Sequence, residues 1–197
     1  MISRRSILSL LGASTVFSKL PGVAMASSTV LIDDFSSAGA AASDAGDWRY
    51  VADTVMGGVS RGQMTPQVLE GRQALRLTGD VSTDNNGGFI QMALPLSSDG
   101  AVVDARAFKG FEIDALGNGE EYNIHLRTTD LRRPWESYRH SFTPSSAWTT
   151  FRLAFDEFES YRAPKALDLS KLRSIGIVAI GRAFQADVAV SGLRFFS

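Results

Sequence analysis

Short apolar runs with period-two alternation are the feature that most constrains how this sequence can fold. In the segment 108–115, Phe111, Ile113 and Ala115 alternate with polar residues. Because successive side chains of a β-strand point to opposite faces, such a segment has one face for the core and one for solvent. Similar runs recur between turn residues at intervals of about ten residues, which is typical of sandwiches. Without any sustained helical periodicity, the pattern predicts an all-β, antiparallel β-sandwich.

The alternation also predicts where the individual strands lie. We expect strands at 29–35, 108–115, 122–128, 137–142, 148–155, 172–180 and 188–196. The turn at 117–119 is expected to join two of these strands in a hairpin, because glycine and asparagine favour tight turns. The segments 156–161 and 167–172 are expected to form short helical turns, and 36–46 is expected to be a loop.

The first residues have the character of an export leader and not of a strand. Residues 1–26 contain the basic pair Arg4 and Arg5, an apolar stretch at 7–17, and a small-x-small cleavage pattern at 24–26. The apolar stretch is shorter than the about 20 residues that cross a bilayer as a helix. We interpret 1–26 as a twin-arginine-like signal peptide, which predicts a periplasmic or exported protein with no stable membrane span. An organellar transit peptide is the alternative.

The remaining segment, 27–197, is expected to be a single domain with a mildly acidic charge. Without the leader it has 17 basic and 21 acidic residues, which disfavours nucleic acid as a partner. The absence of cysteine excludes disulfides and thiolate metal sites, so the apolar core must stabilise the domain alone.

Motifs for catalysis are weak. The segment 58–62 matches the G-x-S-x-G nucleophile elbow around Ser60, but no helix is expected after it, and the only histidines are His125 and His140 in expected strands. Two histidines without cysteine cannot supply the common zinc sets. We therefore predict no catalytic residues, no metal site and no cofactor, with a small serine hydrolase as a weak alternative; whether calcium binds stays open.

Paired glycines and a cluster of aromatic and basic residues are better candidates for binding. Gly57 and Gly58 indicate a tight turn or a close approach of another chain. A cluster around one loop combines guanidinium donors with aromatic faces, which suits recognition of a sugar, a carboxylate or a protein surface. Its members are Arg127, Arg132, Arg133, Trp135, Tyr138 and Arg139.

The segment 53–60, with the sequence DTVMGGVS, resembles the signature of the complex I intermediate-associated protein 30 family. Further segments similar to the family's motifs follow in the same order at 87–89, 108–111, 122–127 and 148–158. The resemblance therefore extends over nearly all of the expected domain. It implies a galactose-binding-like jelly roll, related in shape to carbohydrate-binding modules.

The resemblance also implies a function. Characterised relatives are assembly chaperones for the respiratory NADH:ubiquinone oxidoreductase, and the family has no established catalytic residues. An exported relative would face a different compartment, so its client would differ too. We expect a non-enzymatic binding or assembly module with a protein partner; the alternative is a carbohydrate-binding, lectin-like domain. The candidate binding residues are Asp53, Met56, Gly57, Gly58, Ser60, Arg127, Trp135 and Tyr138.

Overall fold

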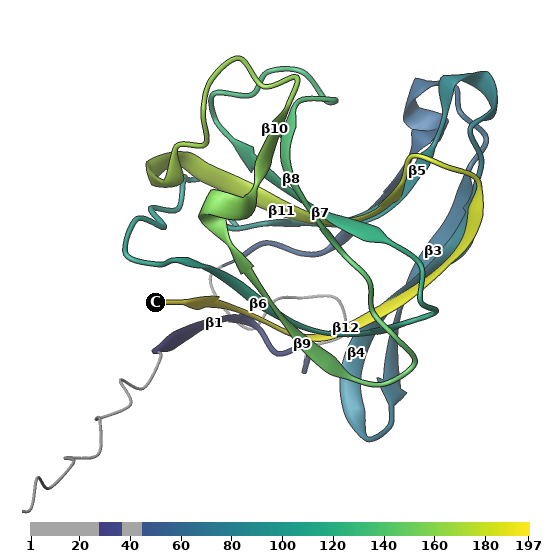
Figure 1. Cartoon of the computed structure of the whole chain (residues 1–197), viewed down its shortest axis with the longest axis horizontal. Helices are drawn as coiled ribbons and strands as arrows, with labels where there is room; N and C mark the ends of the chain where they lie inside the picture. The colour runs from purple at the N-terminus through teal and green to yellow at the C-terminus, as the bar shows by residue number, and fades with distance from the viewer. Residues whose placement is uncertain (1–27, 37–44) are drawn as a thin grey trace, which may run out of the picture.

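The fold is a sandwich of two antiparallel sheets, as predicted (Figure 1). The computed structural model describes residues 28–36 and 45–197, and within these ranges every regular element is a strand or a short 3-10 turn. The predicted signal peptide at 1–26 and residues 37–44 of the predicted loop lie outside the described residues.

Twelve strands and four 3-10 turns are present in the described ranges. The strands are β1 (Thr29–Asp33), β2 (Arg49–Ala52), β3 (Arg61–Leu69), β4 (Arg72–Val81), β5 (Phe89–Pro95), β6 (Gly110–Gly117), β7 (Tyr122–Thr128), β8 (Ser137–Phe142), β9 (Thr149–Ala154), β10 (Glu159–Tyr161), β11 (Leu172–Ile180) and β12 (Phe184–Phe196). The 3-10 turns are η1 (Asp53–Met56), η2 (Asp84–Asn86), η3 (Phe155–Glu157) and η4 (Leu169–Lys171).

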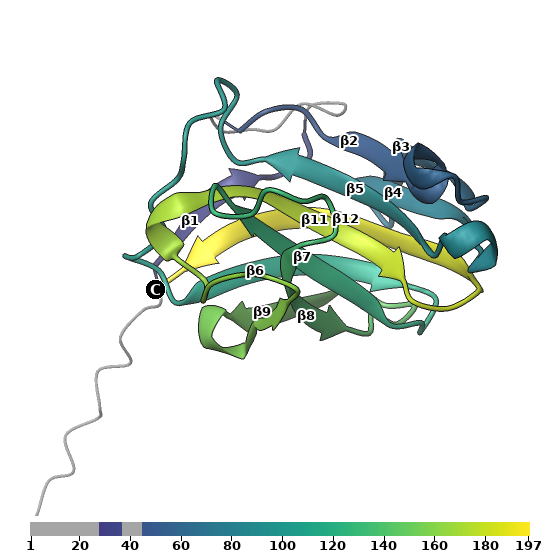
Figure 2. The ribbon, with the colours of Figure 1, turned by 90° about the horizontal axis from the view of Figure 1, so that it is seen from above.

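The two sheets have six strands each. The first sheet has the order β3-β4-β12-β6-β9, with β1 paired to β12, and the second has the order β10-β8-β7-β11-β5-β2. Seen from above, strands of the second sheet cover those of the first, with β11 over β12 (Figure 2). The two ends of the described domain meet, because the backbone N–H of Ser197 donates to the carbonyl of Ser28 at 3.1 Å.

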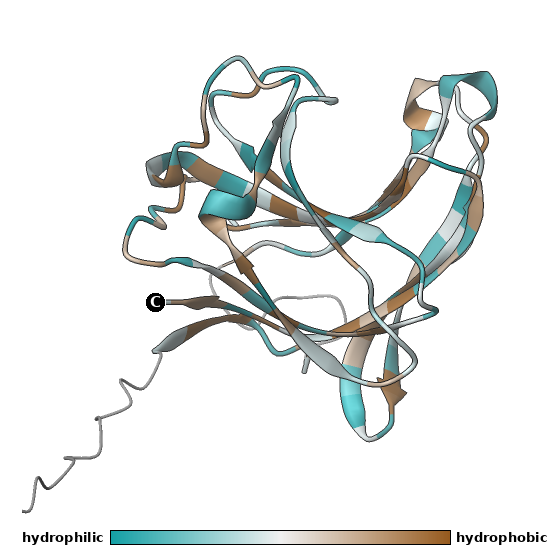
Figure 3. Cartoon of the chain, viewed as in Figure 1, coloured by the Kyte–Doolittle hydropathy of each residue, from teal (hydrophilic) through white to brown (hydrophobic). Residues whose placement is uncertain are grey.

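The core lies between the sheets and is made by the alternating apolar residues. In β7, Tyr122, Ile124 and Leu126 are fully buried, whereas the residues between them face outward. Figure 3 shows the same alternation as changes of colour along the strands. Each fully buried aliphatic side chain stabilises the fold by about 1.5–3 kcal/mol relative to exposure. The inward and outward faces predicted for 108–115 and 122–128 are confirmed.

The predicted hairpin at 117–119 is wrong. β6 belongs to the first sheet and pairs with β12 and β9, whereas β7 belongs to the second sheet and pairs with β11 and β8. The turn therefore carries the chain from one sheet to the other, and Gly117 donates its N–H to the carbonyl of Ser145 at 2.7 Å. Two strands that face each other across the core show the same alternation as two paired strands, so the pattern could not separate these arrangements.

The two predicted helical turns are present only in part. The segment 156–161 holds the end of η3 and then the short edge strand β10, and 167–172 contains η4. None of the helical segments in the described ranges is long and apolar enough to cross a membrane.

Candidate functional site

A groove runs over the outer face of the second sheet. Its floor comes from outward-facing side chains of four strands, Val51 of β2, Gln91 of β5, Val178 of β11 and His125 of β7, and its volume is about 400 Å³. Further lining residues come from β8, from β10, from the β7–β8 loop and from the loops next to β5. We call this cavity the sheet groove.

Apolar and aromatic side chains form the two rims of the sheet groove. On one rim, η1 holds Val55 and Met56 outward, with exposed fractions of 71% and 49%. On the other, Trp135 from the β7–β8 loop is 42% exposed and Tyr161 of β10 is 38% exposed. Large apolar side chains are thus held in solvent on both sides of a concave surface, which is the usual character of a binding site.

A buried carboxylate holds the first rim in place. Asp53 is fully buried at the start of η1 and accepts four hydrogen bonds. Its Oδ1 accepts from the backbone N–H of Ser60 at 3.0 Å, and its Oδ2 accepts from the Ser60 hydroxyl at 2.5 Å. The backbone N–H groups of Gly88 and Phe89 also donate to Oδ2, at 2.6 and 3.2 Å. The Asp53 side chain therefore joins the η1 loop to the beginnings of β3 and β5.

The same contacts explain the protonation state of Asp53. Burial alone would raise the pKa of this carboxyl, but the Ser60 hydroxyl and the amides of Gly88, Phe89 and Ser60 outweigh burial and hold the pKa below its ordinary value of 3.8. Hydrogen bonds to the charged form favour that form. Asp53 is therefore an ionised carboxylate whose charge is compensated by donors of the protein.

The two glycines of the signature serve this loop in different ways. Gly57 has a φ of 89°, in the left-handed region, and an added Cβ would find open space. At Gly58 an added Cβ would lie 2.4 Å from the Asp53 carboxylate. Gly57 thus allows the turn, while Gly58 makes room for the carboxylate.

Ser60 lacks the geometry of a catalytic nucleophile. Its side chain is buried, and its hydroxyl donates to Asp53 while accepting from the backbone N–H of Ser82 at 2.9 Å. The chain continues from it into the strand β3 and not into a helix. A nucleophile elbow needs an exposed serine on a strand-to-helix turn.

Arg127 supports the loop that carries Trp135. Its Nη1 donates to the carbonyls of Pro134 and Glu136 at 2.9 and 2.6 Å, and its Nη2 donates to the carbonyl of Arg133 at 2.9 Å. Three carbonyls of one loop are thereby fixed to a single guanidinium on β7. Of the residues chosen from the sequence, Met56 and Trp135 line the sheet groove, whereas Arg127 lines a neighbouring cavity.

Tyr138 lies on the other side of the sheet. It is fully buried in the core, and its hydroxyl donates to the carbonyls of Lys165 and Ala166 at 3.0 and 3.1 Å. Its neighbours in β8, Ser137 and Arg139, line the sheet groove instead. The structure therefore separates Tyr138 from Trp135, which the sequence placed in one group.

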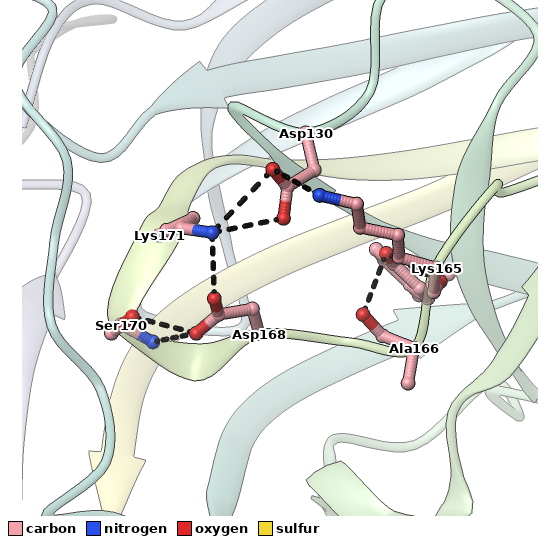
Figure 4. A network of polar contacts seen from close by, with 7 residues as sticks. Asp130, Lys165, Ala166, Asp168, Ser170 and Lys171 are labelled. Atoms are coloured by element: carbon pink, nitrogen blue, oxygen red, sulfur yellow. Dashed lines mark hydrogen bonds and ion pairs between the residues drawn. The ribbon is translucent and has the colours of Figure 1, made fainter.

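A network of ion pairs fixes the loops at this end of the second sheet (Figure 4). The ammonium group of Lys171 lies 3.2 Å from the Asp130 carboxylate and 2.9 Å from that of Asp168. Asp168 also accepts from the backbone N–H of Ser170 at 3.1 Å. Asp130 belongs to the loop that carries Trp135, so the network connects that loop to η4.

His125, Arg139 and Tyr161 also line the sheet groove. Arg139 belongs to the cluster recognised in the sequence but not to the final candidate binding residues, and His125 and Tyr161 were not selected as binding residues. The guanidinium of Arg139 lies 3.5 Å from the centre of the Tyr161 ring. Burial lowers the pKa of His125 to about 3, with Arg139 and Arg127 adding to the shift, so its imidazole is neutral. The alternation in the sequence predicted which residues of β7 and β8 point away from the core. It could not predict which of the two outer sheet faces carries a cavity.

Within residues 28–36 and 45–197, no three acidic, histidine or cysteine side chains gather in a way that could hold a metal ion.

Comparison with known proteins confirms the family resemblance and the fold. The model of the complex I intermediate-associated protein 30 family matches residues 34–188. No curated protein matches the sequence. The family 11 carbohydrate-binding module of cellulosomal cellulase Lic26A-Cel5E of Clostridium thermocellum superimposes with a TM-score of 0.65 at 16% identity, over 85% of this chain and 94% of that one.

Two further solved structures are similar in the same way. The family 11 module from Clostridium thermocellum in complex with a β-1,3-1,4-mixed-linked tetrasaccharide has a TM-score of 0.65 at 14% identity, over 85% of this chain and 94% of that chain. A family 30 carbohydrate-binding module has a TM-score of 0.56 at 15% identity, over 88% of this chain and 89% of that chain. These likenesses confirm the predicted galactose-binding-like sandwich and show the fold alone.

The first prediction concerns the Asp53 carboxylate. We expect Asp53→Asn to lower the free energy of unfolding by about 3 kcal/mol at pH 7, because an amide nitrogen would face donors that now meet a carboxylate oxygen. The folded pKa lies below the unfolded one, so this stabilisation is present above about pH 4 and is lost as the pH falls through the folded pKa. Urea denaturation of both proteins between pH 7 and pH 3 measures the difference, and a difference that stays constant over this range would contradict the assignment.

The second prediction separates the two glycines. We expect Gly58→Ala to destabilise the protein more than Gly57→Ala, because its Cβ would collide with the Asp53 carboxylate, whereas Gly57→Ala has only the backbone cost of about 1 kcal/mol. Gly71→Ala is the control, since Gly71 also has positive φ with open space around its Cβ. Thermal denaturation of the three variants should rank Gly58→Ala alone as severe; equal effects would show that the carboxylate tolerates the added atom.

Proposed function

We propose that this chain, which belongs to the complex I intermediate-associated protein 30 family, is a non-enzymatic binding module that recognises a partner protein in the sheet groove. The family supports a role in the assembly of a protein complex. In this proposal Met56 and Trp135 contact the partner, while Asp53, Gly57, Gly58 and Ser60 hold Met56 in position and Arg127 holds Trp135. Tyr138 contributes by supporting β8 from the core.

The rigid presentation of aliphatic side chains carries this proposal. Val55 and Met56 are exposed at the rim, yet their loop is tied to two strand ends by the four hydrogen bonds of Asp53. An apolar rim that is already ordered loses little conformational entropy on binding. Methionine and aromatic side chains around a concave centre are enriched in protein interfaces.

Binding of a carbohydrate is the second candidate, favoured by the likeness to the module in complex with a tetrasaccharide. Sugar rings pack on free aromatic faces. In this groove, however, Arg139 lies over the Tyr161 ring, and the Arg133 guanidinium is 5.7 Å from the centre of the Trp135 ring. Guanidinium groups already occupy faces that a sugar would need, which makes a protein partner the better fit.

In this proposal the N-terminal signal peptide determines the compartment in which the protein works. The twin-arginine-like segment 1–26 would direct the folded domain to the periplasm or outside the cell, where it would serve a client different from the respiratory complex of its relatives. Organellar import is the alternative.

The third prediction tests the groove directly. A photo-reactive amino acid at position 56, in protein expressed in its native cells, should yield one discrete cross-linked protein that mass spectrometry identifies. The control is the same probe at position 68, because Val68 is also exposed but lies on β3 of the first sheet. Trp135→Ala should weaken binding of the purified partner about tenfold, as expected for the loss of a large aromatic contact.

Two outcomes would contradict the protein-binding proposal. Equal cross-linking from positions 56 and 68 would show that the groove has no special role. Saturable binding of a mixed-linked glucan tetrasaccharide in calorimetry, abolished by Trp135→Ala, would assign the groove to carbohydrate instead.

A further inference from the structure

The outer faces of the two sheets differ in how their arginines are paired. On the first sheet, Arg76 of β4 forms an ion pair with Asp187 of β12 at 2.7 Å. Arg194 of β12 is paired with Glu112 and Asp114 of β6, at 2.9 and 2.7 Å. These two arginines are therefore compensated by carboxylates of neighbouring strands, whereas Arg61 and Arg72 at the β3–β4 edge of the same sheet form no ion pair with a described residue.

The second sheet carries arginines without such partners. Arg49 of β2, Arg127 of β7 and Arg173 of β11 line a cavity of about 580 Å³, which we call the arginine pocket. Val51 lines both this pocket and the sheet groove, so the two cavities are adjacent. In the described part of the chain, neither Arg49 nor Arg173 forms an ion pair, and both are exposed.

Local structure brings two of these guanidinium groups together. The pairing of β11 with β7 shifts register between Leu172 and Ser174, so Arg173 lies at an irregularity of the strand and is exposed. Arg127 is held by three loop carbonyls, as described above. Burial lowers the pKa of Arg127 and the nearby Arg173 lowers it further, while Glu136 acts in the opposite direction. Arg127 thus lies near one carboxylate, that of Glu136, and near a second cation, Arg173.

Carboxylates near the pocket do not neutralise it. Asp47 lines the pocket but is exposed and forms no ion pair with a described residue. The Glu136 carboxylate accepts from the backbone N–H groups of Arg132 and Arg133, at 2.8 and 3.0 Å, and does not line the pocket. The arginine pocket is a cationic surface on a chain whose formal net charge is −1.

A continuous floor joins this cationic surface to the apolar groove. One row of residues crosses five adjacent strands in register: Arg49, Ala93, Gly176, His125 and Arg139. Ala93 and Gly176 leave the middle of the row with little side-chain bulk, His125 follows them, and the two ends carry the guanidinium groups of Arg49 and Arg139. Four strand spacings span about 19 Å, the length of about six residues of an extended peptide.

We propose that the sheet groove and the arginine pocket together bind one extended acidic segment of the partner protein, with apolar side chains against Met56 and Trp135 and carboxylates at Arg49 and Arg173. This inference rests on the proposed function and names the class of its partner. Guanidinium forks suit bidentate contacts with carboxylates, and a mixed apolar and acidic peptide complements both cavities.

The fourth prediction tests this partner class with defined probes. A fluorescein-labelled peptide of about eight residues, alternating Leu and Glu, covers the span of the row. It should bind saturably in fluorescence anisotropy, and its affinity should fall with added salt. The matching Leu/Gln peptide should bind at least about tenfold more weakly, because it lacks the charges that pair with the arginines.

Charge reversal in the pocket supplies the matched variants. Arg49→Glu with Arg173→Glu should weaken binding of the acidic peptide at least about tenfold. The control, Arg72→Glu with Lys109→Glu, makes the same change in net charge at exposed residues outside the second sheet and should leave binding unchanged. Circular dichroism of each variant checks the fold, and glutamine replaces glutamate wherever a reversal prevents folding.

Several results would overturn the acidic-segment proposal. Equal binding of the Leu/Glu and Leu/Gln peptides, equal losses in the two double variants, or no binding of either peptide would each do so. If inorganic phosphate displaces the Leu/Glu peptide at a concentration equal to that of the peptide, the arginine pocket is a simple anion site. If the protein binds polygalacturonate but neither peptide, its ligand is an acidic polysaccharide. If the probe at position 56 still cross-links its partner in the double variant Arg49→Glu with Arg173→Glu, the sheet groove remains the protein-binding site. In that case only the proposal that the partner segment is acidic is wrong.

Discussion

The buried carboxylate of Asp53 connects the two sheets at the edge where the sheet groove begins. It follows β2 of the second sheet, accepts from Ser60 just before β3 of the first, and accepts from Gly88 and Phe89 where β5 returns to the second. A buried charge is stable only when donors surround it. Because the carboxylate and its donors come from three separate segments, ionised Asp53 requires all three to be in position at once.

This requirement divides the signature 53–60 into two kinds of residue. Asp53, Gly58 and Ser60 form or accommodate the network, and they lie below the surface or leave no side chain on it. Val55 and Met56 are the side chains that the network holds in solvent. The segment that carries the family resemblance is therefore mainly a support, and the side chains it places at the sheet groove are those of Val55 and Met56.

The charge pattern gives the sandwich two different outer faces. On the first sheet, ion pairs join the neighbouring strands β4, β12 and β6. The second sheet combines unpaired arginines with an apolar groove, and its polar centre includes the Nε2 atom of His125, which has no hydrogen-bond partner in the described residues. A buried polar atom without a partner is costly, and His125 lies in the floor of the sheet groove, where a bound molecule can supply that partner.

The sequence by itself determined the all-β class, most of the strands after residue 108, the inward faces of β6 and β7, and the family. These follow from alternation and local motifs, which depend on neighbouring residues alone. Only the tertiary structure decided that 117–119 crosses between sheets, that Tyr138 faces the core, and that Met56, Trp135 and Arg139 meet around one groove. Strand order and cavities depend on pairing between distant segments, and alternation is the same whichever strand lies alongside.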